Sequence, residues 1–116
     1  MGSHKAIGSG YFPASSKMEG GFKDRRGNPL RTLQDFLNGK AEYVSTAMDS
    51  NLAIKYGTKL RIPELEKKYG KSIEFRVVDT GDAFKGKGYS RIDICVRDRA
   101  ASLEPTINGS LTLVFP

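Results

Sequence analysis

Three aspartates stand at the ends of short apolar stretches or inside them, where carboxyl groups can carry out acid–base chemistry. Asp49 follows residues 43–48, Asp79 follows residues 73–78, and Asp93 lies within residues 92–96. A carboxylic acid with a raised pKa holds a proton near neutral pH and can deliver it to a leaving group. A neighbouring carboxylate raises that pKa, because two like charges at short range resist joint ionisation. We expect the three carboxyl groups to share one groove wall.

Other nucleophilic chemistry finds little support in the sequence. The single cysteine, Cys95, lies in the apolar run 92–96 and is predicted to be a buried strand residue. The only histidine is His4, in the opening letters MGSH, which resemble an expression tag. A cysteine nucleophile needs a histidine base, so this pair is a poor candidate, and one cysteine allows no intramolecular disulfide.

Alternating apolar residues predict the strands that position the aspartates. The expected strands cover residues 10–14, 43–48, 58–62, 73–78, 92–96 and 111–115. Short helices are expected at 32–39, capped by Thr32, at 63–70, and at 98–103, capped by Asp98. Strands and helices do not alternate regularly, which argues against a parallel doubly wound sheet. A small closed barrel fits best, because closure leaves no exposed strand edge.

The length of 116 residues fits one compact domain. Residues 1–9 are small, polar and rich in Gly and Ser, and are expected to be a disordered tag or linker. The barrel domain is expected to occupy residues 10–116. No apolar run is long enough to cross a bilayer, so no membrane insertion is expected.

Three sequence blocks, in order, resemble the three-aspartate (3D) domain. They are AMD at 47–49 followed by YGTKL at 56–60, VDTGDAFKG at 78–86, and RIDI at 91–94. Related sequences occur in the catalytic barrel of membrane-bound lytic transglycosylase A and in Gram-positive cell-wall hydrolases. The resemblance covers a little under half of the chain.

The resemblance implies a mainly β fold, a six-stranded double-psi β-barrel with two or three short helices. It also implies a catalytic set of Asp93, Asp79 and Asp49, with Asp93 as the general acid and Asp79 holding the proton on it. Substrate-binding residues are expected at Thr58, Thr80, Asp82 and Lys85. No metal or organic cofactor is implied.

Two departures from the family pattern bear on activity. Asp82 stands where the family usually has a second glycine, which adds a fourth carboxylate. The interval between Asp79 and Asp93 is also longer than in the transglycosylase, and it contains a basic, glycine-rich stretch with Lys85. That stretch either contacts the glycan or forms a solvated turn. Clustered carboxylates also suit calcium, but their spacing does not match an EF-hand.

The sequence therefore predicts a peptidoglycan-cleaving enzyme, with a lytic transglycosylase acting on the MurNAc–GlcNAc bond as the favoured reaction. The alternative is a non-catalytic, expansin-like barrel that binds wall glycan. The net charge of +6 suits an anionic polymer, or simply a solubilising surface. Nucleic-acid binding has no recognisable motif in its favour. We expect a monomer in the periplasm, cell wall or secreted fraction, with its targeting segment removed or elsewhere in a longer chain.

Overall fold

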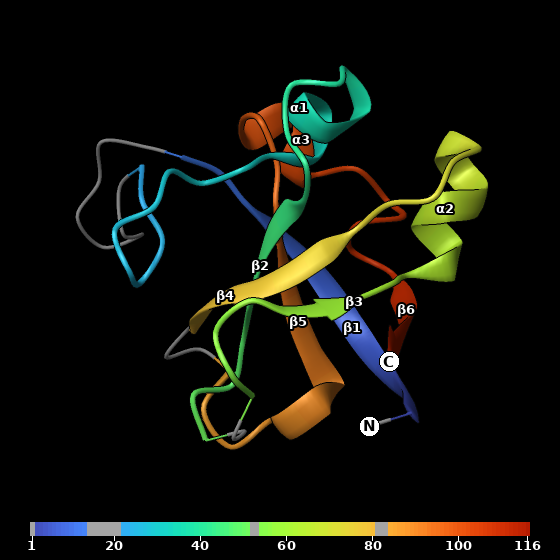
Figure 1. Cartoon of the computed structure of the whole chain (residues 1–116). Coiled ribbons are helices and arrows are strands. Elements are labelled where there is room, and N and C mark those ends of the chain that lie inside the picture. The colour runs from blue at the N-terminus through green and yellow to red at the C-terminus, as the bar shows by residue number, and fades with distance from the viewer. Residues whose placement is uncertain (1, 14–21, 52–53, 81–83) are drawn as a thin grey trace.

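Six strands form one curled sheet in this computed structural model, which describes residues 2–13, 22–51, 54–80 and 84–116. The strands are β1 (Gly2–Tyr11), β2 (Val44–Met48), β3 (Thr58–Leu60), β4 (Phe75–Thr80), β5 (Arg91–Cys95) and β6 (Ser110–Phe115). Their order across the sheet is β3-β4-β2-β5-β1-β6 (Figure 1). The predicted fold class, mainly β with six strands in a barrel and a few short helices, is confirmed.

The sheet curls into a half-barrel whose two edges meet at one point. Arg61, just after β3, and Val114 of β6 exchange two backbone hydrogen bonds of 2.9 Å. Nearby, the Glu64 carboxylate accepts the amide of Thr112 at 2.9 Å and so covers a donor of β6. Two strand pairs are parallel, β1 with β5 and β2 with β4, and both join segments distant in sequence.

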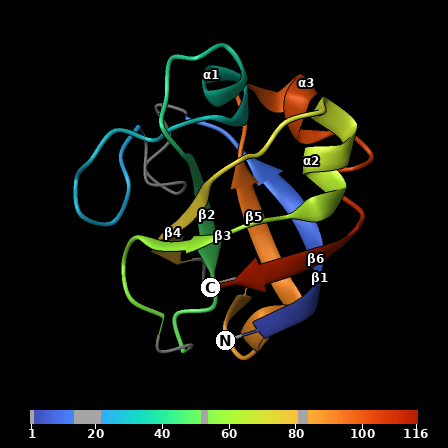
Figure 2. The ribbon, with the colours of Figure 1, turned by 45° about the vertical axis from the view of Figure 1, so that its right-hand side comes forward.

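Three short helices surround the barrel, close to their predicted positions. Helix α1 (Leu33–Leu37) begins at Thr32, whose hydroxyl accepts the Asp35 amide at 3.0 Å. Helix α3 (Arg99–Ser102) is capped by Asp98 in the same way. Both lie at one end of the barrel, while α2 (Pro63–Tyr69) lies beside β6 (Figures 1 and 2). No helix among the described residues is long and apolar enough to cross a membrane.

Strand β1 overturns the expectation that residues 1–9 form a disordered tag. Residues 2–11 pair with β5 on one side and with the edge strand β6 on the other (Figure 2). The His4 ring stacks on Tyr89 with centroids 3.8 Å apart. Small residues are needed here, because a Cβ on Gly8 would lie 2.1 Å from the Ile107 carbonyl oxygen. The glycine at position 8 therefore reflects close packing.

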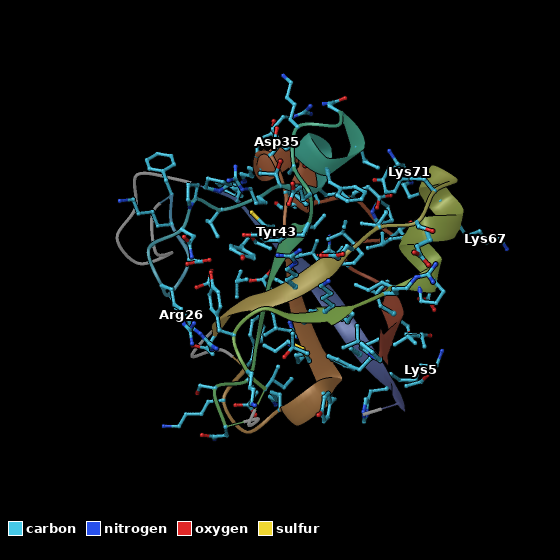
Figure 3. The ribbon with its side chains drawn as sticks, viewed as in Figure 1. Lys5, Arg26, Asp35, Tyr43, Lys67 and Lys71 are labelled. Atoms are coloured by element: carbon cyan, nitrogen blue, oxygen red, sulfur yellow. The ribbon has the colours of Figure 1, made fainter. Side chains whose placement is uncertain are left out.

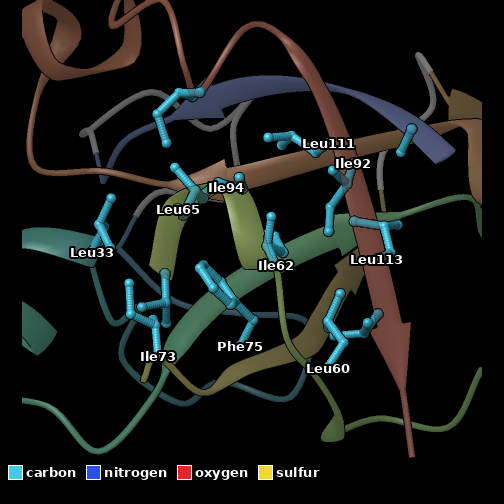
Figure 4. Packing of buried hydrophobic residues seen from close by; sticks show 14 of the residues in the cluster. Leu33, Leu60, Ile62, Leu65, Ile73, Phe75, Ile92, Ile94, Leu111 and Leu113 are labelled. Carbon is cyan, nitrogen blue, oxygen red and sulfur yellow. The ribbon is translucent and has the colours of Figure 1, made fainter. Parts of the chain in front are cut away.

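The core is apolar and comes from every strand. Its largest fully buried side chains are shown in Figure 4 and include Leu60, Ile62, Phe75, Ile92, Ile94, Leu111 and Leu113. On β5, Ile92 and Ile94 point inward, so Arg91 and Asp93 between them point outward. Cys95 is buried, as predicted.

The pairing of β2 with β4 contains one irregularity that matters for the site. Thr46 pairs with Val77, but Ala47 pairs with Asp79, so Val78 is an extra residue in β4. Such a β-bulge changes the alternation of side chains beyond it. Asp79 consequently shares the outer face with Ala47, although Val77 lies in the core.

Candidate functional site

Two of the three predicted catalytic aspartates lie in one row across the outer face of the sheet. Ala47 of β2 pairs with Asp79 of β4 on one side and with Asp93 of β5 on the other. Asp93 pairs in turn with Ser9 of β1. Residues in register on neighbouring strands share a face, so all four side chains project the same way. The row Asp79–Ala47–Asp93–Ser9 is called the aspartate row below.

Strand β1 supplies a hydrogen-bond donor to the Asp93 carboxylate. The Ser9 hydroxyl donates to Asp93 Oδ1 at 3.1 Å. Asp93 is half-buried, as is Asp79. Two strand spacings separate the backbones of Asp79 and Asp93, or about 10 Å. The methyl group of Ala47 adds little bulk between them.

Asp79 lies in an environment that favours its protonated form. Burial and then the negative charge of Asp24 raise its pKa from 3.8 to about 6. The Arg25 amide and the Tyr11 hydroxyl, which donates to Asp79 Oδ2 at 3.4 Å, act in the opposite direction. The strongest charge effect on Asp79 therefore comes from Asp24 in the 22–30 loop.

Asp24 was missed by sequence reasoning. It is buried, and its Oδ1 accepts the amides of Arg26 and Asn28 at 2.9 and 3.0 Å. The Tyr56 hydroxyl donates to its Oδ2, and the Arg26 guanidinium lies over the Tyr56 ring, 4.4 Å from its centroid. These contacts tie the 22–30 loop to the turn before β3. In the sequence, only an aspartate three residues before a glycine signals this role, since aspartate often begins a turn.

From residue type alone Tyr11 could either stack on a sugar ring or pack in the core, and in the structure its hydroxyl donates to Asp79. Burial raises the pKa of its hydroxyl well above the usual value, and the nearby Cys95, Asp79 and Asp93 act in the same direction. The thiol of Cys95 also has a raised pKa, first because it is buried and then because of the two aspartates. Cys95 is thus a packing residue rather than a nucleophile.

The third predicted catalytic aspartate, Asp49, forms hydrogen bonds with backbone amides, one of them in the loop before β5. Its Oδ1 accepts the Asn51 amide and its Oδ2 accepts the Gly88 amide, both at 2.8 Å. These hydrogen bonds, with smaller contributions from the amides of Gly86 and Lys87, lower its pKa. The carboxylate is almost fully buried. Its contacts are those of a residue that shapes the 84–90 loop.

The predicted substrate-binding residues do not gather with the aspartates as a group. Thr58 pairs with core-facing Val77, and its hydroxyl donates to the Lys55 carbonyl at 2.7 Å. Thr80 is exposed at the end of β4, and Lys85 is exposed in the loop before β5. Asp82 lies outside the described residues. In the described part of the chain no group of three or more His, Cys, Asp or Glu residues could hold a metal ion.

Two cavities lined by described residues lie away from the aspartates. One, of about 560 Å³, runs between β3, the end of β6 and the segment before β4. The other, of about 470 Å³, borders residues 39–43. Basic side chains such as Lys5, Arg26, Lys67 and Lys71 are spread around the molecule (Figure 3). The aspartate row is the better candidate for chemistry, since it brings two carboxyl groups to one face and one of them, that of Asp79, has a raised pKa.

The chain was compared with protein-family models, curated proteins and solved structures. No protein-family model, curated protein or solved structure matches the chain.

Proposed function

We propose that the chain is a peptidoglycan-cleaving enzyme, and that its reaction is that of a lytic transglycosylase. The observation that carries the proposal is the aspartate row, in which Asp79 and Asp93 face outward on either side of Ala47. Most enzymes that cleave glycosidic bonds use two carboxyl groups, one on each side of the scissile bond. The resemblance of three sequence blocks to the 3D domain supports peptidoglycan as the glycan.

Asp93 is the general acid in this proposal. Its proton goes to the glycosidic oxygen as the C1–O bond breaks. The C6 hydroxyl of the same sugar then attacks C1, and its proton returns to the Asp93 carboxylate. A 1,6-anhydro sugar forms, no water is consumed, and the carboxyl group ends in its starting state.

Asp79 is the second carboxyl group, and its role is to keep the proton on Asp93. Its raised pKa of about 6 makes it titrate within the working range of an enzyme. Above that pH its negative charge opposes ionisation of Asp93. The Tyr11 hydroxyl and the Arg25 amide hold the Asp79 carboxyl group in place. Asp49 contributes indirectly, by fixing the loop that leads into β5.

A non-catalytic wall-binding barrel is the second candidate. The observation in its favour is that Asp49 accepts backbone amides with both oxygens, so the three aspartates do not act as one cluster. This candidate predicts that the protein sediments with purified sacculi but releases no soluble muropeptide.

The deciding experiment is mass spectrometry of products released from purified sacculi by the wild type and by Asp93→Asn. A lytic transglycosylase yields 1,6-anhydro muropeptides. Asp93→Asn keeps the shape and removes the proton donor, so release should fall by about 10²–10⁴-fold while sedimentation with sacculi persists. The exposed carboxylate of Glu42 supplies the control, Glu42→Gln, which should behave as wild type.

Asp79→Asn separates the roles of the two carboxyl groups. It should lower the rate less than Asp93→Asn, remove a pH dependence centred near 6, and move the optimum downward. Near-normal release by Asp93→Asn would refute the assignment of the acid. Sedimentation of the wild type without any release would favour the binding barrel.

A further inference from the structure

The two edge strands of the sheet, β3 and β6, meet where Arg61 and Val114 exchange both of their backbone hydrogen bonds. This junction is called the seam below. In an antiparallel ladder the next pairs that exchange two hydrogen bonds lie two residues away on each side. One of these pairs contains Pro63 and the other contains Pro116. Proline has no backbone N–H, so neither pair can form completely and the seam stays short.

The two sides of the seam differ in what covers the strand edges. On one side the Glu64 carboxylate accepts the amide and the hydroxyl of Thr112, at 2.9 and 2.8 Å. On the other side Lys59 stands opposite Pro116. Backbone groups two residues apart in a strand point the same way, so the peptide group of Lys59 points toward β6, as that of Arg61 does. Because Pro116 has no N–H to donate, the Lys59 carbonyl oxygen is left for another donor.

The cavity of about 560 Å³ opens on the side of the seam that holds Lys59 and Pro116. Ligand pockets commonly have volumes of about 300–1,000 Å³. The apolar part of its lining comes from four segments of the chain and consists of Phe36, Leu60, Ile73, Val114 and Phe115. A ligand in this cavity therefore meets apolar side chains together with the uncovered edge of β3.

The outward-facing side of β3 carries an excess of positive charge. Lys59 and Arg76 are paired across β3 and β4, so their side chains share a face. They also share one carboxylate, that of Glu74, at 3.9 and 2.6 Å. The side chain of Lys59 is 60% exposed and has the longer of the two contacts. An acidic side chain placed beside Lys59 on a neighbouring strand would therefore be attracted.

We propose that the seam binds an extended peptide segment of a partner protein, which adds to the edge of β3 as a short strand. The central residue of the segment lies opposite Lys59 and exchanges two backbone hydrogen bonds with it. That residue is acidic, because its side chain shares the face of Lys59. Its two neighbours are apolar, because they point to the other face and enter the cavity. This site is separate from the aspartate row, and the inference does not depend on the proposed cleavage.

The probe is the peptide TVEVT, acetylated and amidated at its ends. Isotope-labelled protein is titrated with it in near-physiological salt and followed by amide NMR spectra. The amide signals of Lys59, Arg61 and Phe115 should shift and saturate with a Kd below about 1 mM, while those of Ala47 and Asp93 stay unchanged. Methylation of the glutamate nitrogen removes the donor to the Lys59 carbonyl oxygen and should weaken binding by about two- to tenfold.

Protein variants test the cavity and the charge separately. Ser72 is exposed and lines the cavity, so Ser72→Trp should fill part of it and abolish measurable binding. Lys59→Gln should weaken binding of the glutamate peptide by about two- to fivefold and leave binding of the matching glutamine peptide unchanged. The control Lys67→Gln removes an equal charge from an exposed position on α2 and should bind both peptides as the wild type does (Figure 3).

Absence of shifts, or shifts centred on the aspartate row, overturns the proposal. Equal affinity for the methylated peptide overturns it too, because the cavity would then recognise apolar groups without strand pairing. Sedimentation of the protein alone tests a second copy as the occupant, and a dimer that Ser72→Trp disrupts would also overturn the proposal. If Ser72→Trp does not fold, the methylated peptide and Lys59→Gln decide. Release of muropeptide by the wild type, or its absence, leaves each of these results unchanged.

Discussion

Replacing Asp79 by asparagine should stabilise the protein at neutral pH but not in acid. Burial, followed by the negative charge of Asp24, raises the pKa of Asp79 to about 6 in the folded chain. Above that pH the folded protein carries an ionised carboxylate in an environment that disfavours it. Asparagine has nearly the same shape and can still accept one hydrogen bond while remaining neutral.

The magnitude follows from proton linkage. The folded state binds the proton of Asp79 more tightly than the unfolded state, so this group favours folding most below its ordinary pKa of 3.8. That contribution is lost between pH 3.8 and about 6. Two pH units correspond to about 3 kcal/mol, and partial exposure reduces this to about 1–2 kcal/mol. Asp79→Asn should gain that amount over wild type across this window.

Urea denaturation of both proteins at intervals from pH 3.5 to pH 8 measures the difference. In a chain of this length, about 1–2 kcal/mol corresponds to a rise in Tm of about 4–8 °C. Asp49→Asn is the control of opposite sign. Hydrogen bonds from Asn51 and Gly88 lower the pKa of Asp49, so its stabilising effect is present above its ordinary pKa and is lost as pH falls. A free-energy difference between Asp79→Asn and wild type that is the same at every pH would refute the reasoning.

Two further predictions concern packing. Gly8→Ala should destabilise the protein by about 1–3 kcal/mol in urea denaturation, as overpacked cores do, because its Cβ would meet the Ile107 carbonyl oxygen and the Leu111 side chain; unchanged stability would mean that β1 is not packed as described. The thiol of Cys95 should react with a thiol reagent at pH 8 only after denaturation, since it is buried and its pKa is raised; prompt reaction of the native protein would contradict this.

Local patterns predicted most of the elements correctly. The alternation of residues 73–78 predicted β4, and Thr32 and Asp98 were identified as helix caps from residue type alone. The apolar run around Cys95 gave both β5 and the burial of that cysteine. These features depend on neighbours in the sequence, which is why sequence reasoning reaches them.

Features that depend on distant contacts could not be predicted in the same way. Residues 2–9 resemble a flexible tag because they are small and polar, but Gly8 is required where the Ile107 carbonyl oxygen approaches the strand. The closeness of Asp24 to Asp79 depends on how a loop folds back across 55 positions of chain. The engagement of Asp49 by the Gly88 amide is likewise a long-range contact. Residue types alone do not specify such approaches.

The extra residue at Val78 has a consequence for the fidelity of folding. If β4 paired with β2 without it, Asp79 would lie opposite Met48, which faces the apolar interior. Slippage to that uninterrupted ladder would drive a carboxylate into the core, at a cost of several kcal/mol even after it takes up a proton. Asp79, which is proposed to support catalysis, therefore also helps to fix the register of β2 and β4. In the native register its carboxyl group lies on the outer face, whereas in the slipped register the same group would be buried in the apolar core.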